Sequence, residues 1–318
     1  MFCTIIIGTF VKFHYSEAME NTLAIVIPAY KPAFLDLALR SIAAQSDRDF
    51  VLYVGDDASP HDIKSVLAPY EGQFQLVYHR FPDNLGGKDL VGQWERCMGL
   101  VENENWIYLF SDDDVMPPDA VERFHAAVSG GGEFFRFPLD TVDSDGNIRF
   151  VHTSFSAPKT TAEDYLKGYL AGLRPSAACE YIFSRRLFRE VPMVHFPLAW
   201  CSDIASWYSY ASRAGAIVNL EGAPVLWRNA DGVNISNSIG LEDVKMEALI
   251  QFVTWLSKEY KGVPDNEYRR ALRIFISTNL KYSFGGKFSR KNLVRLSRAF
   301  AATDRRRAFE ILVNNILT

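Results

Sequence analysis

The chain has 318 residues, of which 48% are hydrophobic and 14% aromatic, so it can bury one large core or two unequal ones. Its formal net charge of -4 excludes the strongly basic footprint of most nucleic-acid-binding proteins, and we expect no nucleic-acid partner. The four cysteines are scattered without a CxxC pair, so the sequence signals neither a zinc site nor a disulfide framework, and a reducing cytosol fits best. No apolar run reaches the roughly 20 residues that cross a bilayer.

Residues 1–21 form an N-terminal extension ahead of the first clear strand. Our preferred hypothesis is that Met19 is the native start and that residues 1–18 are a wrongly assigned extension or a loose tail. A signal peptide is the alternative, but no basic stretch precedes its apolar part and no small-residue cleavage pattern follows it.

The next part of the chain alternates short, branched apolar runs with amphipathic segments. Such runs are typical of strands buried on both faces of a parallel sheet, and the segments have helical spacing. We predict strands at residues 23–28, 50–54, 74–79 and 106–110, and helices at 34–44, 61–70, 89–101 and 119–128. This alternation predicts an open, mainly parallel α/β sheet flanked by helices, with ligands outside the carboxyl ends of the strands.

The second half of the chain changes character after the glycines at 130–132. We predict strands near residues 134–138, 147–152 and 177–183, and helices at 161–173 and 202–214. From residue 241 onwards the pattern is helical almost throughout, so residues 241–318 are expected to form a mostly helical C-terminal extension.

Two acidic clusters follow predicted strands and fall at the same edge of the sheet. Asp112, Asp113 and Asp114 would repel one another at a strand end unless a cation neutralised them. Hard oxygen ligands suit Mg²⁺ or Mn²⁺, which bind few protein side chains together with diphosphate oxygens. The alternative is a solvated helix cap, because Asp is favoured there and prolines follow; Asp56 and Asp57 have the same ambiguity.

These segments resemble family 2 glycosyltransferases, whose nucleotide-binding domain has the GT-A fold. The resemblance rests on the order and spacing of motifs across about residues 22–235. They are IVIPAY at 25–30, VGDDAS at 54–59, NLGG at 84–87, a helix with Trp94 and Arg96, and YLFSDDD at 108–114. The resemblance implies a GT-A-like catalytic domain at 22–240, with a nucleotide-binding part at 22–130 and an acceptor part at 131–240.

The resemblance also implies roles for single residues. Asp57 would hydrogen-bond the nucleobase, and Asp112 would lie beside the ribose. Asp113 would hold the metal, with Asp114 supporting it directly or through water. Many relatives carry an aspartate where this chain has Ser111, so each ligand role in the cluster could belong to the neighbouring position. The other residues implied at the donor site are Pro28, Ala29 and Tyr30 around the base and ribose, Asn84 and Gly86 in the loop, and Arg228 near the diphosphate.

Sugar transfer also needs a base that removes the proton of the acceptor hydroxyl. Relatives use the aspartate of a Glu-Asp pair at the start of a helix, and Ser202-Asp203 resembles that pair with serine in place of glutamate. Asp203 is therefore the candidate catalytic base. The alternative is an ordinary N-terminal helix residue that the helix dipole favours.

The sequence thus predicts an enzyme that transfers a single sugar from a nucleotide sugar, expected to be a UDP-sugar, to a saccharide or lipid-linked acceptor. Inversion at the anomeric carbon, a divalent metal and a setting in surface-polysaccharide assembly follow from the resemblance. The alternatives are a catalytically inactive nucleotide-sugar-binding homologue and a receiver-like phosphate-binding switch. The latter leaves residues 130–318 unexplained.

A basic stretch lies near the C-terminus. Residues 281–307 contain nine Lys or Arg against one acidic residue, Asp304. Interleaved apolar residues can form a stripe, so one hypothesis is an amphipathic helix lying on the inner face of an anionic membrane. The alternative is a solvated helix that packs on the catalytic domain.

Overall fold

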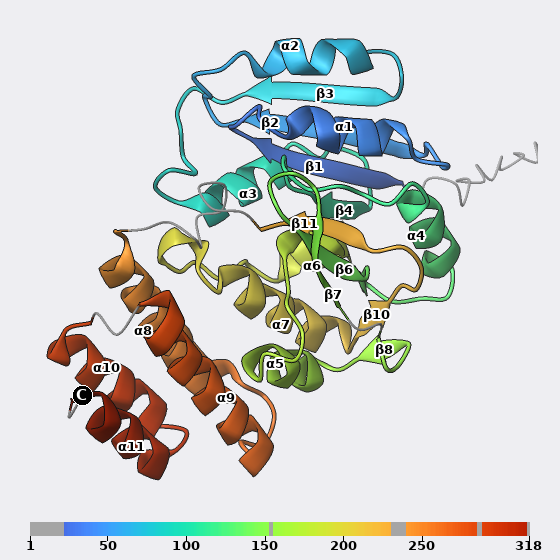
Figure 1. Ribbon diagram of the computed structural model, residues 1–318. Coiled ribbons are helices and arrows are strands. Elements are labelled where there is room, and N and C mark those ends of the chain that lie inside the picture. The colour runs from blue at the N-terminus through green and yellow to red at the C-terminus, as the bar shows by residue number, and fades with distance from the viewer. Residues whose placement is uncertain (1–21, 153–154, 230–239, 285–287, 317–318) are drawn as a thin grey trace, which may run out of the picture.

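The computed structural model describes residues 22–152, 155–229, 240–284 and 288–316 (Figure 1). The predicted N-terminal extension lies outside these described residues. The fold is mixed α/β: a β-sheet forms the centre, helices cover both of its faces, and a helical C-terminal region lies beside it.

The main sheet has eight strands in the order β3-β2-β1-β4-β9-β5-β10-β8. The first four run parallel, whereas β9 lies antiparallel between β4 and β5. This confirms the predicted open, mainly parallel sheet. The strands are β1 Leu23–Ala29, β2 Phe50–Asp56, β3 Gln75–Arg80, β4 Trp106–Leu109, β5 Phe134–Arg136, β8 Lys159–Thr160, β9 Tyr181–Ser184 and β10 Ile217–Asn219.

Strand β1 explains why its sequence is apolar at every position. Successive side chains of a strand point to opposite faces, and each face of this sheet is covered. Ile25 and Ile27 belong to the core under helix α1 (Leu35–Ala43), whereas Val26 belongs to the core on the other face, with α3 (Leu90–Met98). Burial on both faces fixes the position of β1, and therefore the place at which the loop after its carboxyl end begins.

Helices α2 (Ile63–Leu67) and α4 (Ala120–Val128) complete the first half. Helices α5 (Ala162–Leu170), α6 (Arg185–Glu190) and α7 (Ser202–Ala214) belong to the second half, and α5 packs on α7. The prediction of a strand at 177–183 is correct only in its last part. Residues Ala178–Glu180 form a 3₁₀ turn, η3, because the Glu180 carboxylate accepts a hydrogen bond from the Ala177 amide at 3.0 Å.

A second, three-stranded sheet stands beside the acidic turn after β4. It has the order β11-β6-β7, formed by β11 Val225–Arg228, β6 Leu139–Val142 and β7 Ile148–Val151. Val115 bridges to Leu226 of β11, so this sheet supports the segment that follows the acidic cluster.

The C-terminal region is helical, as predicted. Helix α8 (Glu242–Glu259) packs against the 3₁₀ turn η4 (Pro197–Ala199), and α9 (Asn266–Thr278) packs against α5. A π-helical turn, η6, follows at Asn279–Ser283. Helices α10 (Arg290–Ala301) and α11 (Arg305–Ile316) then pack on each other, and α10 also packs on α8.

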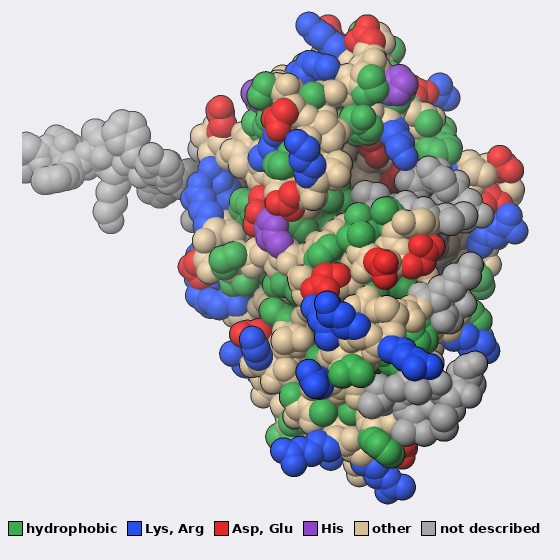
Figure 2. Space-filling model, turned by 90° about the vertical axis from the view of Figure 1, so that its left-hand side faces the viewer, with side chains coloured by type: hydrophobic (Ala, Val, Ile, Leu, Met, Phe, Trp, Pro, Cys, Tyr) green, Lys and Arg blue, Asp and Glu red, His purple; other side chains and the backbone are tan. Residues whose placement is uncertain are grey.

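The structure favours the packed-helix alternative for the basic stretch. The apolar stripe of α10 is internal, because Leu293, Leu296 and Phe300 are at most 1% exposed. Figure 2 shows Lys and Arg side chains spread over the whole face, its lower end included, with no patch confined to one end. None of the helices in the described part of the chain is long and apolar enough to span a membrane.

Candidate active site

A pocket of about 710 Å³ lies at the carboxyl ends of β1 and β4. Its walls include the loop after β1, the loop before α3, the acidic turn after β4 and the segment before α7, and single residues of other elements complete the lining. The predicted site residues that line it are Pro28, Tyr30, Asp57, Asn84, Gly86, Asp112, Asp113 and Asp203. Most of the residues chosen from sequence therefore converge on a single cavity.

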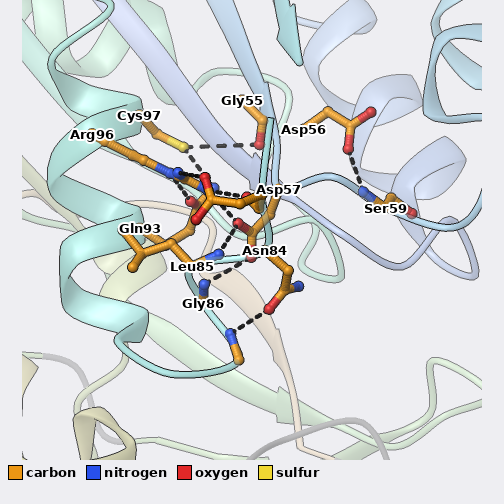
Figure 3. Close-up of polar contacts among 12 residues, drawn as sticks. Gly55, Asp56, Asp57, Ser59, Asn84, Leu85, Gly86, Gln93, Arg96 and Cys97 are labelled. Atoms are coloured by element: carbon orange, nitrogen blue, oxygen red, sulfur yellow. Dashed lines mark hydrogen bonds and ion pairs between the residues drawn. The ribbon is translucent and has the colours of Figure 1, made fainter. Parts of the chain in front are cut away.

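Asp57 is 4% exposed and holds the loop before α3 in place (Figure 3). Its carboxylate accepts hydrogen bonds from the amides of Leu85 at 2.8 Å and Gly86 at 2.9 Å. The guanidinium of Arg96, on α3, forms an ion pair with the same carboxylate. Asp57 therefore shapes the loop as well as lining the pocket, a role that sequence analysis missed.

Neighbouring contacts make this loop rigid. The Asn84 side chain accepts a hydrogen bond from the Gly87 amide at 2.8 Å, which closes a tight turn. Arg96 also donates to the Asp83 carbonyl at 2.8 Å and lies 4.0 Å from the centroid of the Phe81 ring. Gly86 leaves no room for a side chain, because an added Cβ would lie 2.7 Å from an Asp57 carboxylate oxygen.

The acidic turn after β4 places its carboxylates in different surroundings. The Asp112 carboxylate accepts hydrogen bonds from the amides of Tyr30 at 3.1 Å and Lys31 at 3.4 Å, while burial raises the pKa of Asp112 to about 6. Burial, and then the charges of Asp114 and Asp112, raise the pKa of Asp113 to about 8. The turn thus crowds three carboxyl groups together beside the pocket, and their burial and mutual repulsion favour the protonated forms.

Three predicted donor-site residues are not among the described residues that line the pocket. Ala29 is fully buried in β1, and its carbonyl accepts a hydrogen bond from the Asp57 amide at 2.9 Å. Asp114 is 1% exposed and accepts a hydrogen bond from the Arg228 amide at 2.7 Å. The Arg228 guanidinium donates to the carbonyls of Asp113 at 3.0 Å and Asp143 at 2.6 Å. Arg228 therefore stabilises the acidic turn through hydrogen bonds to Asp113 and Asp114, on the side away from the pocket.

The side chains that could bind a metal ion fit an ion whose other ligands come largely from the substrate. Within the described residues, no three His, Cys, Asp or Glu side chains form a cluster that could hold a metal ion. Asp113 does line the pocket, in a crowded carboxylate turn whose repulsion a cation would relieve. One carboxylate together with diphosphate oxygens is a usual arrangement for Mg²⁺.

Asp203 occupies the second position of α7 and opens into the same pocket. It is half-buried, and burial raises the pKa of Asp203 to about 7. A carboxyl group with a pKa near 7 can take up a proton at neutral pH, which suits a general base.

Aromatic side chains that were not among the predicted site residues also line the pocket. Buried aromatic residues are more often part of the core, so residue type alone did not place Trp94, Tyr169 or Trp227 in a cavity. The structure places these three in the lining, which also includes the turn at 198–201.

Solved structures with a similar fold include a TarS fragment, residues 1–349, from S. aureus. In its complex with UDP-GlcNAc it has a TM-score of 0.70 and 14% identity, over 92% of this chain and 89% of that chain. In its complex with UDP it has a TM-score of 0.67 and 15% identity, over 92% of this chain and 88% of that chain. At this identity the similarity establishes the GT-A fold. No curated protein matches the sequence.

The sequence itself matches a family description. The model of glycosyl transferase family 2 covers residues 24–189, more than half of the chain, including the Asp57 loop and the acidic turn. This match contradicts the receiver-like alternative. The chain belongs to glycosyl transferase family 2.

Proposed function

We propose that this protein transfers a single sugar from a nucleotide sugar to a hydroxyl group of a saccharide or lipid-linked acceptor, with inversion at the anomeric carbon. The observation that carries the proposal is that Asp57, Asp113 and Asp203 line one pocket although they lie far apart in the sequence. A donor, its diphosphate and an acceptor can therefore meet in one place.

The nucleoside of the donor would lie against the loop that Asp57 organises. Pro28 and Tyr30 line the pocket beside Asp112, so they can pack around the base and ribose. Asp57 already accepts two amide hydrogen bonds and forms an ion pair with Arg96, so its carboxylate is held in place before a nucleobase binds. Such a preformed site loses little conformational entropy on binding.

The structure supports Asp113 as the residue that would hold a divalent cation, and Asp114 stays a prediction for this role. A bound Mg²⁺ or Mn²⁺ would supply Lewis-acid stabilisation of the departing nucleoside diphosphate. Asp113 would orient the diphosphate, and Arg228 would keep the acidic turn in place through its bonds to backbone carbonyls.

Asp203 would remove the acceptor hydroxyl proton as the oxygen attacks the anomeric carbon. The new glycosidic bond forms on the face opposite the breaking bond to the diphosphate, so a single displacement inverts the configuration. Asp203 then holds the proton, and the nucleoside diphosphate carries away the electron pair of the broken bond.

A UDP-sugar is the donor we propose, because the structurally similar TarS fragment was crystallised with UDP-GlcNAc and with UDP. Surface-polysaccharide assembly and a cytoplasmic location remain part of the proposal. We also propose residues 22–240 as the catalytic domain, with its nucleotide-binding part at 22–130, its acceptor part at 131–240, and residues 241–318 as its helical extension.

A panel of UDP-, GDP- and dTDP-sugars tests the proposal. A donor should raise the thermal stability of the protein only when Mn²⁺ or Mg²⁺ is present, because a ligand that binds the native state stabilises it. The same donor should then be hydrolysed or transferred. Binding without any turnover would support the inactive-homologue alternative, and neither binding nor turnover would overturn the proposal.

A further inference from the structure

The wall of the pocket next to Asp203 is a turn with unusual backbone conformations. Leu198 has φ 59°, Ala199 has φ 55° and Cys201 has φ 62°, and all three line the pocket. Each left-handed residue other than glycine costs roughly 1–2 kcal/mol. Such strain persists where the surrounding structure over-determines it, which is common at functional sites.

Serine hydroxyls of α7 hold this turn from its C-terminal side. The Ser202 hydroxyl accepts a hydrogen bond from the Phe196 amide, and the Ser206 hydroxyl accepts one from the Val194 amide, both at 2.8 Å. Ser202 and Ser206 are fully buried, so these bonds are shielded from water. The start of α7 and the strained turn therefore form one unit, and Asp203 belongs to it.

The strained turn presents Trp200 to the pocket. Its ring is stacked on Phe284 with centroids 5.5 Å apart and an interplanar angle of 26°. The Lys245 ammonium lies 5.2 Å from the centroid of the Trp200 ring. Both neighbours come from the C-terminal helical region, Lys245 from α8 and Phe284 from the end of η6. This region therefore supports a side chain of the pocket.

Trp200 differs from the other aromatic residues nearby in the sequence. Trp207 and Tyr208, on α7, are at most 1% exposed and belong to the core. Trp200 is only partly buried and lines the cavity three residues before Asp203. A general base must touch the acceptor hydroxyl, so the ring on the same short unit stands beside the acceptor. A flat indole can pack against the apolar C–H face of a pyranose ring.

We propose that Trp200 is the stacking platform for a saccharide acceptor, and that Phe284 and Lys245 are positioning residues that fix the indole plane. The inference rests on the proposed function and deepens it, because it selects a pyranose as the acceptor class. It also makes the C-terminal helical region part of the acceptor site.

The test uses the full chain and the donor that the wild-type protein turns over fastest in the panel above. Acceptors are a set of p-nitrophenyl hexosides and N-acetylhexosaminides, and donor hydrolysis by water is measured in parallel. Trp200→Ala should raise the acceptor KM about tenfold, the effect of about 1.4 kcal/mol of lost stacking. The Kd for UDP should stay within about twofold of wild type, and donor hydrolysis by water should fall much less than transfer to the hexosides.

Phe284→Ala should raise the acceptor KM about threefold with kcat unchanged, since the platform remains but is less well fixed. Phe284→Tyr, which keeps the ring, should restore the wild-type KM. Trp255→Ala is the matched control, because Trp255 is also partly buried on α8 but is not among the described lining residues. It should leave the acceptor KM unchanged.

The outcomes separate the inference from the proposed function. A wild-type protein that turns over no donor overturns the proposed function and the inference with it. A wild-type protein that hydrolyses donor but glycosylates none of the hexosides overturns the saccharide platform alone. An unchanged acceptor KM in Trp200→Ala, or an equal loss of hydrolysis and transfer, also overturns the platform alone.

Discussion

The guanidinium of Arg96 and the carboxylate of Asp57 form an ion pair in which the side chains are 20% and 5% exposed. The pair joins α3 to the end of β2, and through the Leu85 and Gly86 amides it fixes the loop that lines the pocket. The stability of the fold and the shape of the candidate donor site therefore depend on the same contact.

Replacing Arg96 should weaken both. Arg96→Leu leaves the buried Asp57 charge without its cation, a loss that costs about 3 kcal/mol or more in comparable pairs. Urea denaturation should show this fall, and UDP binding by calorimetry should weaken. Arg40→Leu is the control, since it breaks an exposed pair with Asp36 and should cost less than about 1 kcal/mol. Equal effects of the two changes would contradict the structural role of Arg96.

Gly86→Ala should displace the loop. The new Cβ would lie 2.7 Å from an Asp57 oxygen, a distance that forces the carboxylate or the backbone to move. Overpacking of this kind costs about 1–3 kcal/mol, and the Kd for UDP should rise. Gly168→Ala is the matched control, because that position on α5 has open space and alanine favours helix. UDP binding as tight as in wild type by Gly86→Ala would count against this description of the loop.

Asp113→Asn should remove metal-dependent donor binding. The amide lacks the negative charge that a divalent cation needs, so Mn²⁺ should no longer enhance UDP binding in a thermal-shift assay. Asp145→Asn changes an exposed carboxylate at 143–147 and should behave as wild type. If Asp113→Asn keeps the full response to Mn²⁺, another residue holds the cation.

Asp203→Asn should reduce transfer by about 10²–10⁴-fold while leaving UDP binding intact, because it removes a general base but no donor contact. Since burial raises the pKa of Asp203 to about 7, the deprotonated form accumulates above that pH. In the wild type, kcat should therefore rise with pH through about 7 and then level off. Transfer at the wild-type rate by Asp203→Asn would disprove the assignment.

The same carboxyl group should affect stability. Its pKa is raised in the native state, to about 7, whereas an unfolded Asp titrates near 3.9, so the native state binds more protons between these values. The contribution of Asp203 to stability is complete below the unfolded pKa and is lost as pH rises through about 7. Denaturation at several pH values should show a shallower decline for Asp203→Asn than for wild type.

Contact with an anionic membrane would have to use charge, because the apolar stripe of α10 is buried. We expect weak cosedimentation with phosphatidylglycerol vesicles at low ionic strength and none at about 1 M salt, where the Debye length is about 3 Å. Reversing Arg290, Lys291 and Arg298 should abolish it, whereas reversing Lys64 on α2 should not. Binding that survives high salt would contradict a purely electrostatic contact.

The sequence predicted β1, β2 and β4 of the central sheet well because these strands are buried on both faces, whereas the short strands β8 and β10 were not predicted. In β1 and β4 burial leaves apolar runs that end abruptly in polar turns, so both the strands and the acidic edge could be recognised. Strand β6 could not be predicted, since Pro138 precedes it and its polar Asp140 and Thr141 are buried by the neighbouring strands β11 and β7.

Most of the candidate site was predictable, but not the face to which each side chain points. Pro28 and Tyr30 line the pocket and the intervening Ala29 does not, which is the alternation of an extended chain. The same alternation places Trp227 in the pocket and Arg228 behind the acidic turn. A motif gives the positions of such residues in the chain, whereas packing against β6 and α1 decides which of them faces a ligand.

The stacking of Trp200 on Phe284 has a practical consequence for work with shortened proteins. A truncation after residue 240 would retain every aspartate of the pocket, yet it would uncover the indole and remove the helix that packs on η4. Such a fragment could bind nucleotide normally and still be a poor enzyme, so its inactivity would say little about the chemistry of the intact chain.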